Sequence, residues 1–140
     1  MTGFWRQWMA VWRLSVAGFG LVLAGAAFEA TSGPVRMIFA LVGEALPPEM
    51  GEPLRFSIAL MGAVTLGWWL TLEAAFRAID LLGEKAAPVW RGVTLSVVGW
   101  YVIDGALSAA TGYALNIVPN TLLLAGYLIP VMATGVLRRA

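Results

Sequence analysis

One ionisable residue, Asp104, lies inside a long apolar part of this 140-residue chain and is the first candidate for chemistry. The stretches on either side of it, residues 92–103 and 105–117, contain no Lys, Arg or Glu. If they form a helix in lipid, a charged carboxylate there costs about 2.5–3.5 kcal/mol. Asp104 must therefore face a polar partner or water, or take up a proton. Such a residue can be a proton or cation relay, or a hydrogen-bonded clamp between helices.

Several polar side chains could surround Asp104. Trp100 and Ser108 lie four residues away on either side, so on a helix they share its face. Thr65 and Tyr127, in other apolar stretches, lie at compatible depths to donate hydrogen bonds. The candidate site is Asp104, Ser108, Trp100 and Tyr127. With one carboxylate and no basic residue at that depth, we favour a clamp that holds three helices together over a relay.

The composition excludes most other chemistry. The chain has no Cys and no His, which removes disulfides, thiolate nucleophiles, Ser-His-Asp triads and imidazole ligands for zinc or haem. Glycine-rich phosphate loops are absent, and the net charge of +1 comes without a basic run that could grip nucleic acid. We expect no cofactor, no metal site and no enzymatic activity, because no nucleophile can be paired with a base.

The elements that must position Asp104 are four long apolar stretches. With 60% hydrophobic and 12% charged residues, the chain has too little polar surface for a soluble globule. Backbone groups in lipid must bond within their own segment, which favours helices. The predicted fold is therefore all-α: an integral membrane four-helix bundle in a single transmembrane domain, residues 1–140. The predicted spans cover residues 8–28, 54–76, 91–114 and 119–137.

Gly and Pro residues mark the helix ends. The first helix should cover residues 4–28, and the second should continue to Leu82, where Gly83 stops it. Residues 34–44 are too short to span and predict an interfacial or re-entrant helix in the first outer loop. Asn116 and Asn120, around the last outer turn, are interpreted as caps. Alternatively, the N-terminus is a cleaved signal peptide, since residues 24–26 resemble a cleavage box.

The basic residues predict the orientation. Cytoplasmic loops of membrane proteins carry an excess of Lys and Arg. With both termini in the cytoplasm of a cell (inner) membrane, seven of the nine basic residues face inward: Arg6, Arg13, Arg77, Lys85, Arg91, Arg138 and Arg139. Arg36 and Arg55 then lie outside, in the longest and most acidic loop.

Helix rise predicts two ion pairs between the first two spans. Arg13 precedes Glu29 by 16 residues, and Glu73 follows Arg55 by 18. At about 1.5 Å per residue, each span therefore carries one charge near each boundary. We expect Arg13 to pair with Glu73 and Glu29 with Arg55. The alternative is that each charge reaches water or pairs locally, as Glu73 could with Arg77.

Small residues predict where the helices pack. In lipid, helices associate by close backbone approach, which small side chains allow. The second span carries a small residue at every fourth position: Ala59, Ala63, Gly67, Thr71 and Ala75. The first span offers Gly20 and Ala24. We expect these to be seams within the bundle, with a homo-oligomer interface as the alternative.

The architecture looks like that of small four-span bacterial membrane proteins. Small multidrug transporters share this size, but their defining carboxylate is in the first helix, where this chain has none before Glu29. The leading hypothesis is a non-enzymatic structural or accessory membrane subunit in the lipid bilayer. The alternative is a proton-coupled or small-molecule transporter that works through Asp104. Expected partners are another membrane protein or a second copy, and not nucleic acid.

Overall fold

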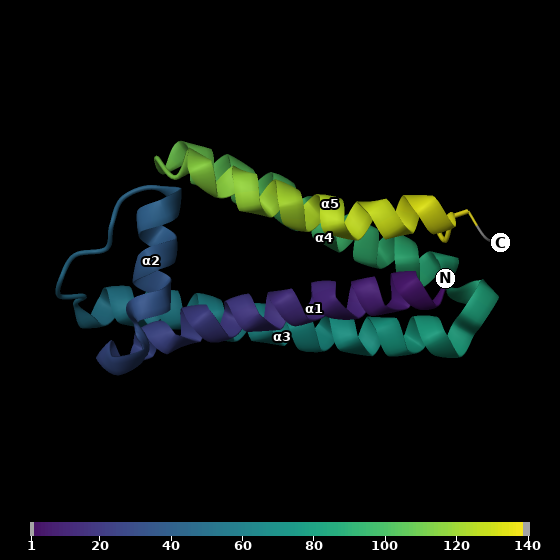
Figure 1. The fold of residues 1–140 in the computed structure, drawn as a ribbon, viewed down its shortest axis with the longest axis horizontal. Helices are drawn as coiled ribbons and strands as arrows, with labels where there is room; N and C mark the ends of the chain where they lie inside the picture. The colour runs from purple at the N-terminus through teal and green to yellow at the C-terminus, as the bar shows by residue number, and fades with distance from the viewer. Residues whose placement is uncertain (1, 139–140) are drawn as a thin grey trace.

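A computed structural model describes residues 2–138, and every regular element in that range is helical. The long helices are α1 (Gly3–Ala24), α3 (Glu52–Leu82), α4 (Ala87–Ala110) and α5 (Ile117–Thr134), with the shorter α2 (Gly33–Val42) between the first two (Figure 1). Three helical stretches are long and apolar enough to cross a membrane by length and composition: Gly3–Ala27, Glu52–Ala110 and Ala114–Thr134. The middle stretch contains both α3 and α4, which turn back on each other at the 3-10 segment η3 (Gly83–Ala86).

The ends of α3 and α4 follow their glycine and proline residues. As predicted, α3 ends at Leu82, and Gly83 has φ 55°, a backbone conformation that a side chain disfavours. Pro88 lies in the first turn of α4, where its missing N–H costs no helical bond. At the other end, α4 stops at Ala110 and Gly112 turns the chain with φ 86°. The third helix therefore begins before residue 91 and ends before residue 114, the predicted bounds of the span.

The first helix also ends earlier than predicted. α1 stops at Ala24, passes into the 3-10 turn η1 (Gly25–Ala27), and Phe28 is extended with φ −122° and ψ 139°. Two hydrogen bonds explain this ending. The Thr31 hydroxyl donates to the Gly25 carbonyl at 2.6 Å, and the same carbonyl accepts from the Phe28 backbone N–H at 3.4 Å, so the chain turns away from the helix axis here.

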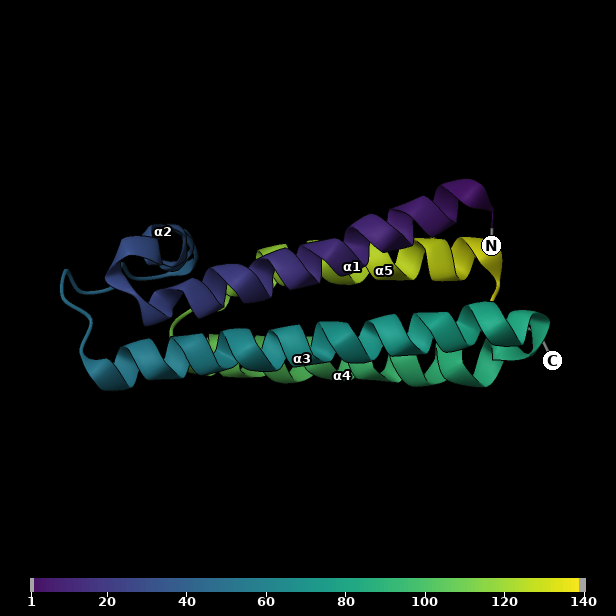
Figure 2. The same ribbon diagram turned by 90° about the horizontal axis from the view of Figure 1, so that it is seen from below.

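The long helices form two antiparallel pairs, α1 with α3 and α4 with α5. The pairs lie close together at the end that carries both termini and diverge towards α2 (Figures 1 and 2). The larger core fills the closed end and takes residues from all four long helices, including Trp12, Phe76, Trp90 and Tyr127. A second core joins α1, α2 and α3 at the open end, and its buried residues include none from α4 or α5.

Gly62 sets the closest approach of α1 and α3. A Cβ on Gly62 would lie 2.3 Å from the Ala24 backbone nitrogen and 2.8 Å from the Gly20 carbonyl oxygen. The predicted contribution of Gly20 and Ala24 is therefore correct. The predicted stripe on the second span is only partly correct. Ala63 and Gly67 are exposed and take no part in the contact with α1, whereas Ala75 packs against the larger core.

α2 runs across the open end and not along the long helices (Figure 1). Its C-terminal part meets the turn between α4 and α5. Phe39 packs edge-on against Tyr113 with ring centroids 5.9 Å apart, and a Cβ on Gly43 would lie 2.3 Å from the same Tyr113 ring. Phe39 and Gly43 therefore connect α2 to the α4–α5 pair.

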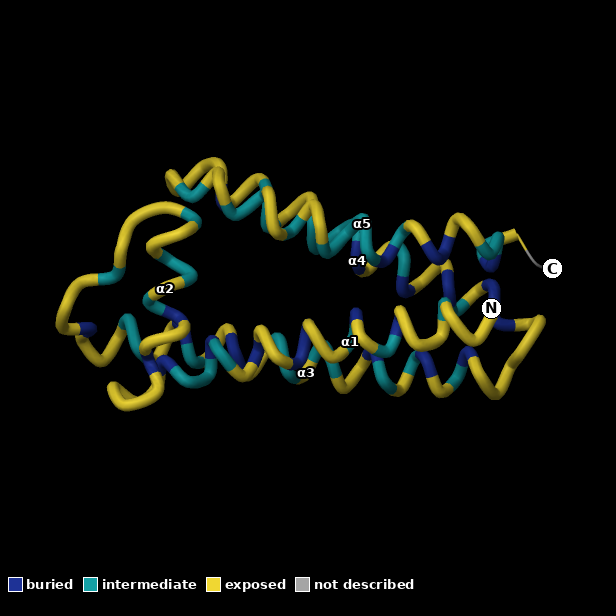
Figure 3. Tube along the Cα trace, viewed as in Figure 1, coloured by how far each residue is buried: buried dark blue, intermediate teal, exposed yellow. Residues whose placement is uncertain are grey.

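Large apolar side chains cover the outer surface of the long helices. The buried positions face between the helices, whereas most of the outer turns are exposed (Figure 3). The exposed set includes Leu14 and Leu21 on α1, Phe56 and Val64 on α3, Leu95 and Leu107 on α4, and Leu122 and Met132 on α5. Monomeric soluble proteins rarely expose apolar surface this continuous.

Candidate functional site

Asp104 lies on α4 and is half-buried. It precedes the helix end at Ala110 by six residues, which is about 9 Å along the helix axis. A helix that continued beyond residue 110 would place Asp104 further from the end of the span. The early end of α4 instead places the carboxylate near the turn that leads into α5.

Three side chains donate hydrogen bonds to one oxygen of Asp104, Oδ2. Asn116 Nδ2 lies 3.1 Å away, Asn120 Nδ2 donates as well, and the Ser108 hydroxyl lies 3.4 Å away. Asn116 also donates to Ser108 Oγ at 3.0 Å, which closes the network. Asn116 ends the 3-10 turn η4 (Ala114–Asn116), and Asn120 is in the first turn of α5. The carboxylate therefore fastens both arms of the α4–α5 hairpin.

This network corrects the interpretation of the two asparagines as caps. The Asn116 side chain makes no capping hydrogen bond at the start of α5. Both amides instead turn towards Asp104, because the turn after Ala110 brings residues 12 and 16 positions further along the chain beside it. The spacing of an Asp and two Asn residues across a Gly-containing turn is the signal that the sequence offered.

Tyr127 does not join Asp104. Its hydroxyl lies 2.9 Å from the Thr94 hydroxyl, in the larger core, and its ring packs against Trp12 at 5.1 Å. Thr65 donates to the Met61 carbonyl of its own helix. The predicted clamp across three helices is therefore replaced by a clamp within one helical hairpin.

Trp100 turns away from the carboxylate and towards α3. Its ring packs against Trp68 with centroids 5.6 Å apart. Of the four predicted site residues, the structure brings together Asp104 and Ser108, and it places Trp100 and Tyr127 in separate packing contacts.

The surroundings of Asp104 are built for hydrogen bonding. Its partners are two amides and a hydroxyl, and no salt bridge within residues 2–138 includes it. Arg55, which could have reached inward, donates to Glu29 and to the Met50 carbonyl instead. The same range holds no group of three His, Cys, Asp or Glu residues that could bind a metal ion. Hydrogen bonds from several neutral donors to one carboxylate oxygen are charge-assisted and stabilise the local structure strongly.

The structure brings both predicted ion pairs together. Arg13 Nε lies 2.6 Å from Glu73 Oε1, with both side chains mostly buried, and the Arg13 guanidinium lies 4.3 Å from the centre of the Phe76 ring. Arg77 is exposed and does not replace Arg13 as the partner. Arg55 pairs with Glu29 at the opposite end of the same helix pair. α1 and α3 are thus joined by charge at both ends.

Glu29 also binds a second arginine, Arg36 of α2, at 3.1 Å. The hydrogen bond from Arg55 is the main cause that lowers the pKa of Glu29 from its ordinary value of 4.5, and the charge of Arg36 adds to it. Arg36 continues to the Pro47 and Pro48 carbonyls at 2.6 and 2.9 Å. One carboxylate therefore organises the loop that holds α2.

No known protein family, curated protein or solved structure matches the chain.

Proposed function

We propose that this chain is an integral membrane protein with α1, α3, α4 and α5 as its four spans and both termini in the cytoplasm. Within the membrane it acts as a structural or accessory subunit and not as an enzyme. Asp104 serves as the fastener of the α4–α5 hairpin. The observation that carries the proposal is the apolar outer surface of the long helices.

The small buried fraction of these helices supports a lipid environment. In the most apolar windows of the α3–α4 stretch and of α5, 17% of the residues are buried within the protein. The rest is apolar surface that water would solvate poorly and lipid tails solvate well.

The distribution of charge supports the orientation. Arg6, Arg77, Lys85 and Arg91 lie at the end with the termini, as does Arg138, whereas Arg139 lies outside the described residues. The opposite end carries the acidic loop with Glu44 and Glu49. By the positive-inside rule, the end with the termini is cytoplasmic.

The divergence of the two helix pairs supports an accessory role. Towards α2, the α4–α5 pair contributes no residue to the second core, and its apolar side chains there, such as Val102 and Leu107, are exposed. Helices of a partner could pack on these faces. An activity of the chain alone would need a polar route to Asp104, and the hairpin network supplies none of the charged partners that a relay uses.

Cysteine labelling tests the membrane topology, because the natural chain has no Cys and each introduced one is unique. Glu49→Cys, in the outer loop, should react with a membrane-impermeant maleimide on intact cells. The matched variant Lys85→Cys, in η3, should react only after the membrane is opened. Equal labelling of both in intact cells, or a monodisperse protein in buffer without detergent, would refute the proposal.

Native purification in mild detergent tests the accessory role. We expect a stoichiometric partner that remains bound through two chromatography steps. A lone homodimer that carries protons into proteoliposomes, with loss of that flux in Asp104→Asn, would instead establish the transporter.

A further inference from the structure

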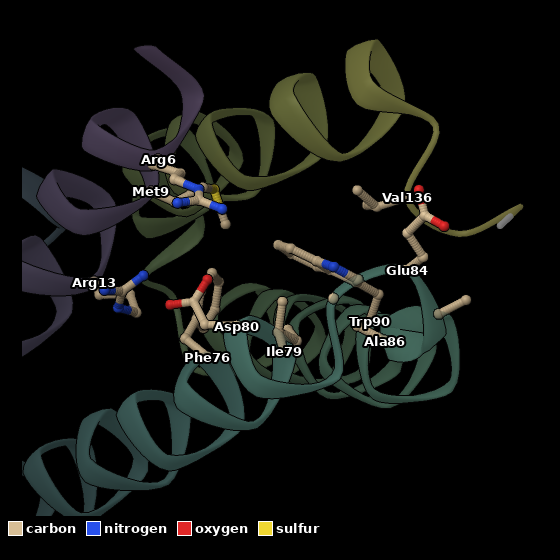
Figure 4. Close-up of a pocket in the computed structure, with 12 residues that line it drawn as sticks. Arg6, Met9, Arg13, Phe76, Ile79, Asp80, Glu84, Ala86, Trp90 and Val136 are labelled. Carbon is tan, nitrogen blue, oxygen red and sulfur yellow. The ribbon is translucent and has the colours of Figure 1, made fainter. Parts of the chain in front are cut away.

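A cavity of about 330 Å³ opens at the closed end of the molecule, between α1, α3, η3 and the start of α4. Its apolar wall includes Phe76 and Trp90, and the Trp90 indole extends into the space (Figure 4). Arg6 and Asp80 lie on one side of this ring and Glu84 on the other (Figure 4). The cavity therefore combines an aromatic surface with charges of both signs.

Three charged side chains of this cavity have no ion-pair partner within residues 2–138. Arg13 also lines it, but its guanidinium is held by Glu73. Within residues 2–138, no salt bridge or side-chain hydrogen bond engages Arg6, Asp80 or Glu84. One available cation and two available carboxylates thus face a shared space.

The cavity also lies at the cytoplasmic ends of the proposed spans. Arg6 is in the first turn of α1 and Asp80 in the last turn of α3, so the cavity sits where two proposed spans reach the cytoplasmic boundary. Trp5 and Trp8 lie on the same turns of α1 as Arg6, and Trp is enriched where a membrane meets water. Lipid headgroups are the ligands present at this height.

We propose that this cavity binds a zwitterionic phospholipid headgroup, with the phosphate on Arg6 and the ammonium between Asp80 and Glu84. The inference rests on the membrane insertion proposed above. An arginine binds phosphate oxygens well, and carboxylates attract an ammonium group. A purely anionic headgroup has no positive group that could pair with the two carboxylates, so they would repel it. The volume, at the lower end of the roughly 300–1,000 Å³ of ligand sites, suits a headgroup.

The test uses the full chain in nanodiscs made from equal amounts of phosphatidylethanolamine and phosphatidylglycerol. After release into mild detergent, native mass spectrometry counts the lipids that remain bound. We expect phosphatidylethanolamine to be retained in preference to phosphatidylglycerol. Because an exposed ion pair contributes about 0.2–1 kcal/mol, each carboxylate removed should reduce this preference by up to about fivefold.

Three variants probe the individual charges. Asp80→Asn and Glu84→Gln should lower retention of phosphatidylethanolamine and leave phosphatidylglycerol unchanged or increased. Arg6→Gln should lower retention of both lipids, because both carry the phosphate. The matched control Arg77→Gln removes an exposed charge on the same part of α3 that does not line the cavity, and it should change nothing.

Soluble phosphoethanolamine distinguishes a lipid from a free ligand. If millimolar phosphoethanolamine displaces the lipid and binds equally well alone, the site takes the soluble molecule. Equal retention of the two lipids by the natural protein, or three cavity variants that behave like Arg77→Gln, would overturn the proposal. Neither result would alter the cysteine labelling pattern, so the membrane topology is judged separately.

Discussion

The indole N–H of Trp8 on α1 donates a 2.7 Å hydrogen bond to the backbone carbonyl of Gly126 on α5. This carbonyl would ordinarily accept from the N–H of residue 130, but Pro130 has none. Trp8 thus replaces the bond that the proline removes. Beside it, Trp12 donates to the Leu123 carbonyl at 2.8 Å and lies against Gly126, where a Cβ would be 3.3 Å from its ring.

Trp8→Phe should lower the free energy of unfolding by about 1 kcal/mol, because it leaves the Gly126 carbonyl without its donor. Pro130→Ala restores a backbone N–H at the right position. In that background, Trp8→Phe should cost less. Unfolding in mixed micelles measures this cycle. Trp5→Phe, which removes an indole with no hydrogen bond in the described chain, is the control, and additive effects would contradict the replacement.

Removal of either partner of the Arg13–Glu73 pair should destabilise the protein by about 1–3 kcal/mol, between the values for exposed and buried pairs, since both side chains are mostly covered. The double exchange Arg13→Glu with Glu73→Arg should recover part of the folded yield. Recovery should be incomplete, because the guanidinium leaves the Phe76 ring. Fluorescence-detected size exclusion reports the yield. A double exchange no better than the single changes would exclude the pair as a stabilising contact.

The lowered pKa of Glu29 leads us to expect that the stability of the protein depends on pH. Its pKa is lower in the folded protein than its ordinary value of 4.5, so its contribution is present above that ordinary value. The contribution is lost as the pH falls through the folded pKa and Glu29 takes up a proton. Glu29→Gln should therefore melt below the natural protein at pH 7, and the difference should vanish in acid. A difference in Tm that persists unchanged below the folded pKa would contradict this assignment.

Gly62 and Gly67 form a matched pair on α3. Gly62→Ala places a methyl group against the α1 backbone, which should separate α1 from α3 and cost about 1–3 kcal/mol. Gly67→Ala meets nothing within 4 Å and should be neutral or stabilise the helix by up to about 1 kcal/mol. Melting temperatures in detergent compare the two. Equal effects would show that α1 and α3 do not meet at Gly62.

Asp104→Asn should preserve the fold, because the amide oxygen still accepts from Asn116 and Asn120. Asp104→Leu has a similar size but no acceptor, and it leaves both amides without their partner. We expect it to cost about 1–3 kcal/mol and to loosen the α4–α5 hairpin. Proteolysis at the 111–116 turn and thermal melting measure these effects. A variant Asp104→Leu as stable as Asp104→Asn would argue against the clamp.

Local signals predicted the turn between α3 and α4 and the charge pairs. Gly83 and Pro88 act through their own backbone, so their effect is independent of packing. Arg13 with Glu73, and Glu29 with Arg55, followed from helix rise alone, because two spans that cross the same thickness align their charges by depth.

Rotation about the helix axis could not be predicted. The outer face of α3 is as apolar as the inner one, so hydrophobicity does not indicate whether the Gly62 face or the Gly67 face meets α1. The same holds for Trp100, which turns to Trp68 and not to Asp104. The partnership of Asp104 with Asn116 and Asn120 depends on the backbone path around Gly112, which spacing along a helix does not describe.

The contact of α2 with Tyr113 affects how the two helix pairs can move. The pairs are joined in sequence at η3 and packed there by the larger core, so η3 is the natural hinge. At the far end, Phe39 and Gly43 form a latch about one helix length from that hinge. A small rotation at η3 becomes a large displacement at the contact of Phe39 and Gly43 with Tyr113. A force applied at that contact therefore changes the angle between the two helix pairs most easily.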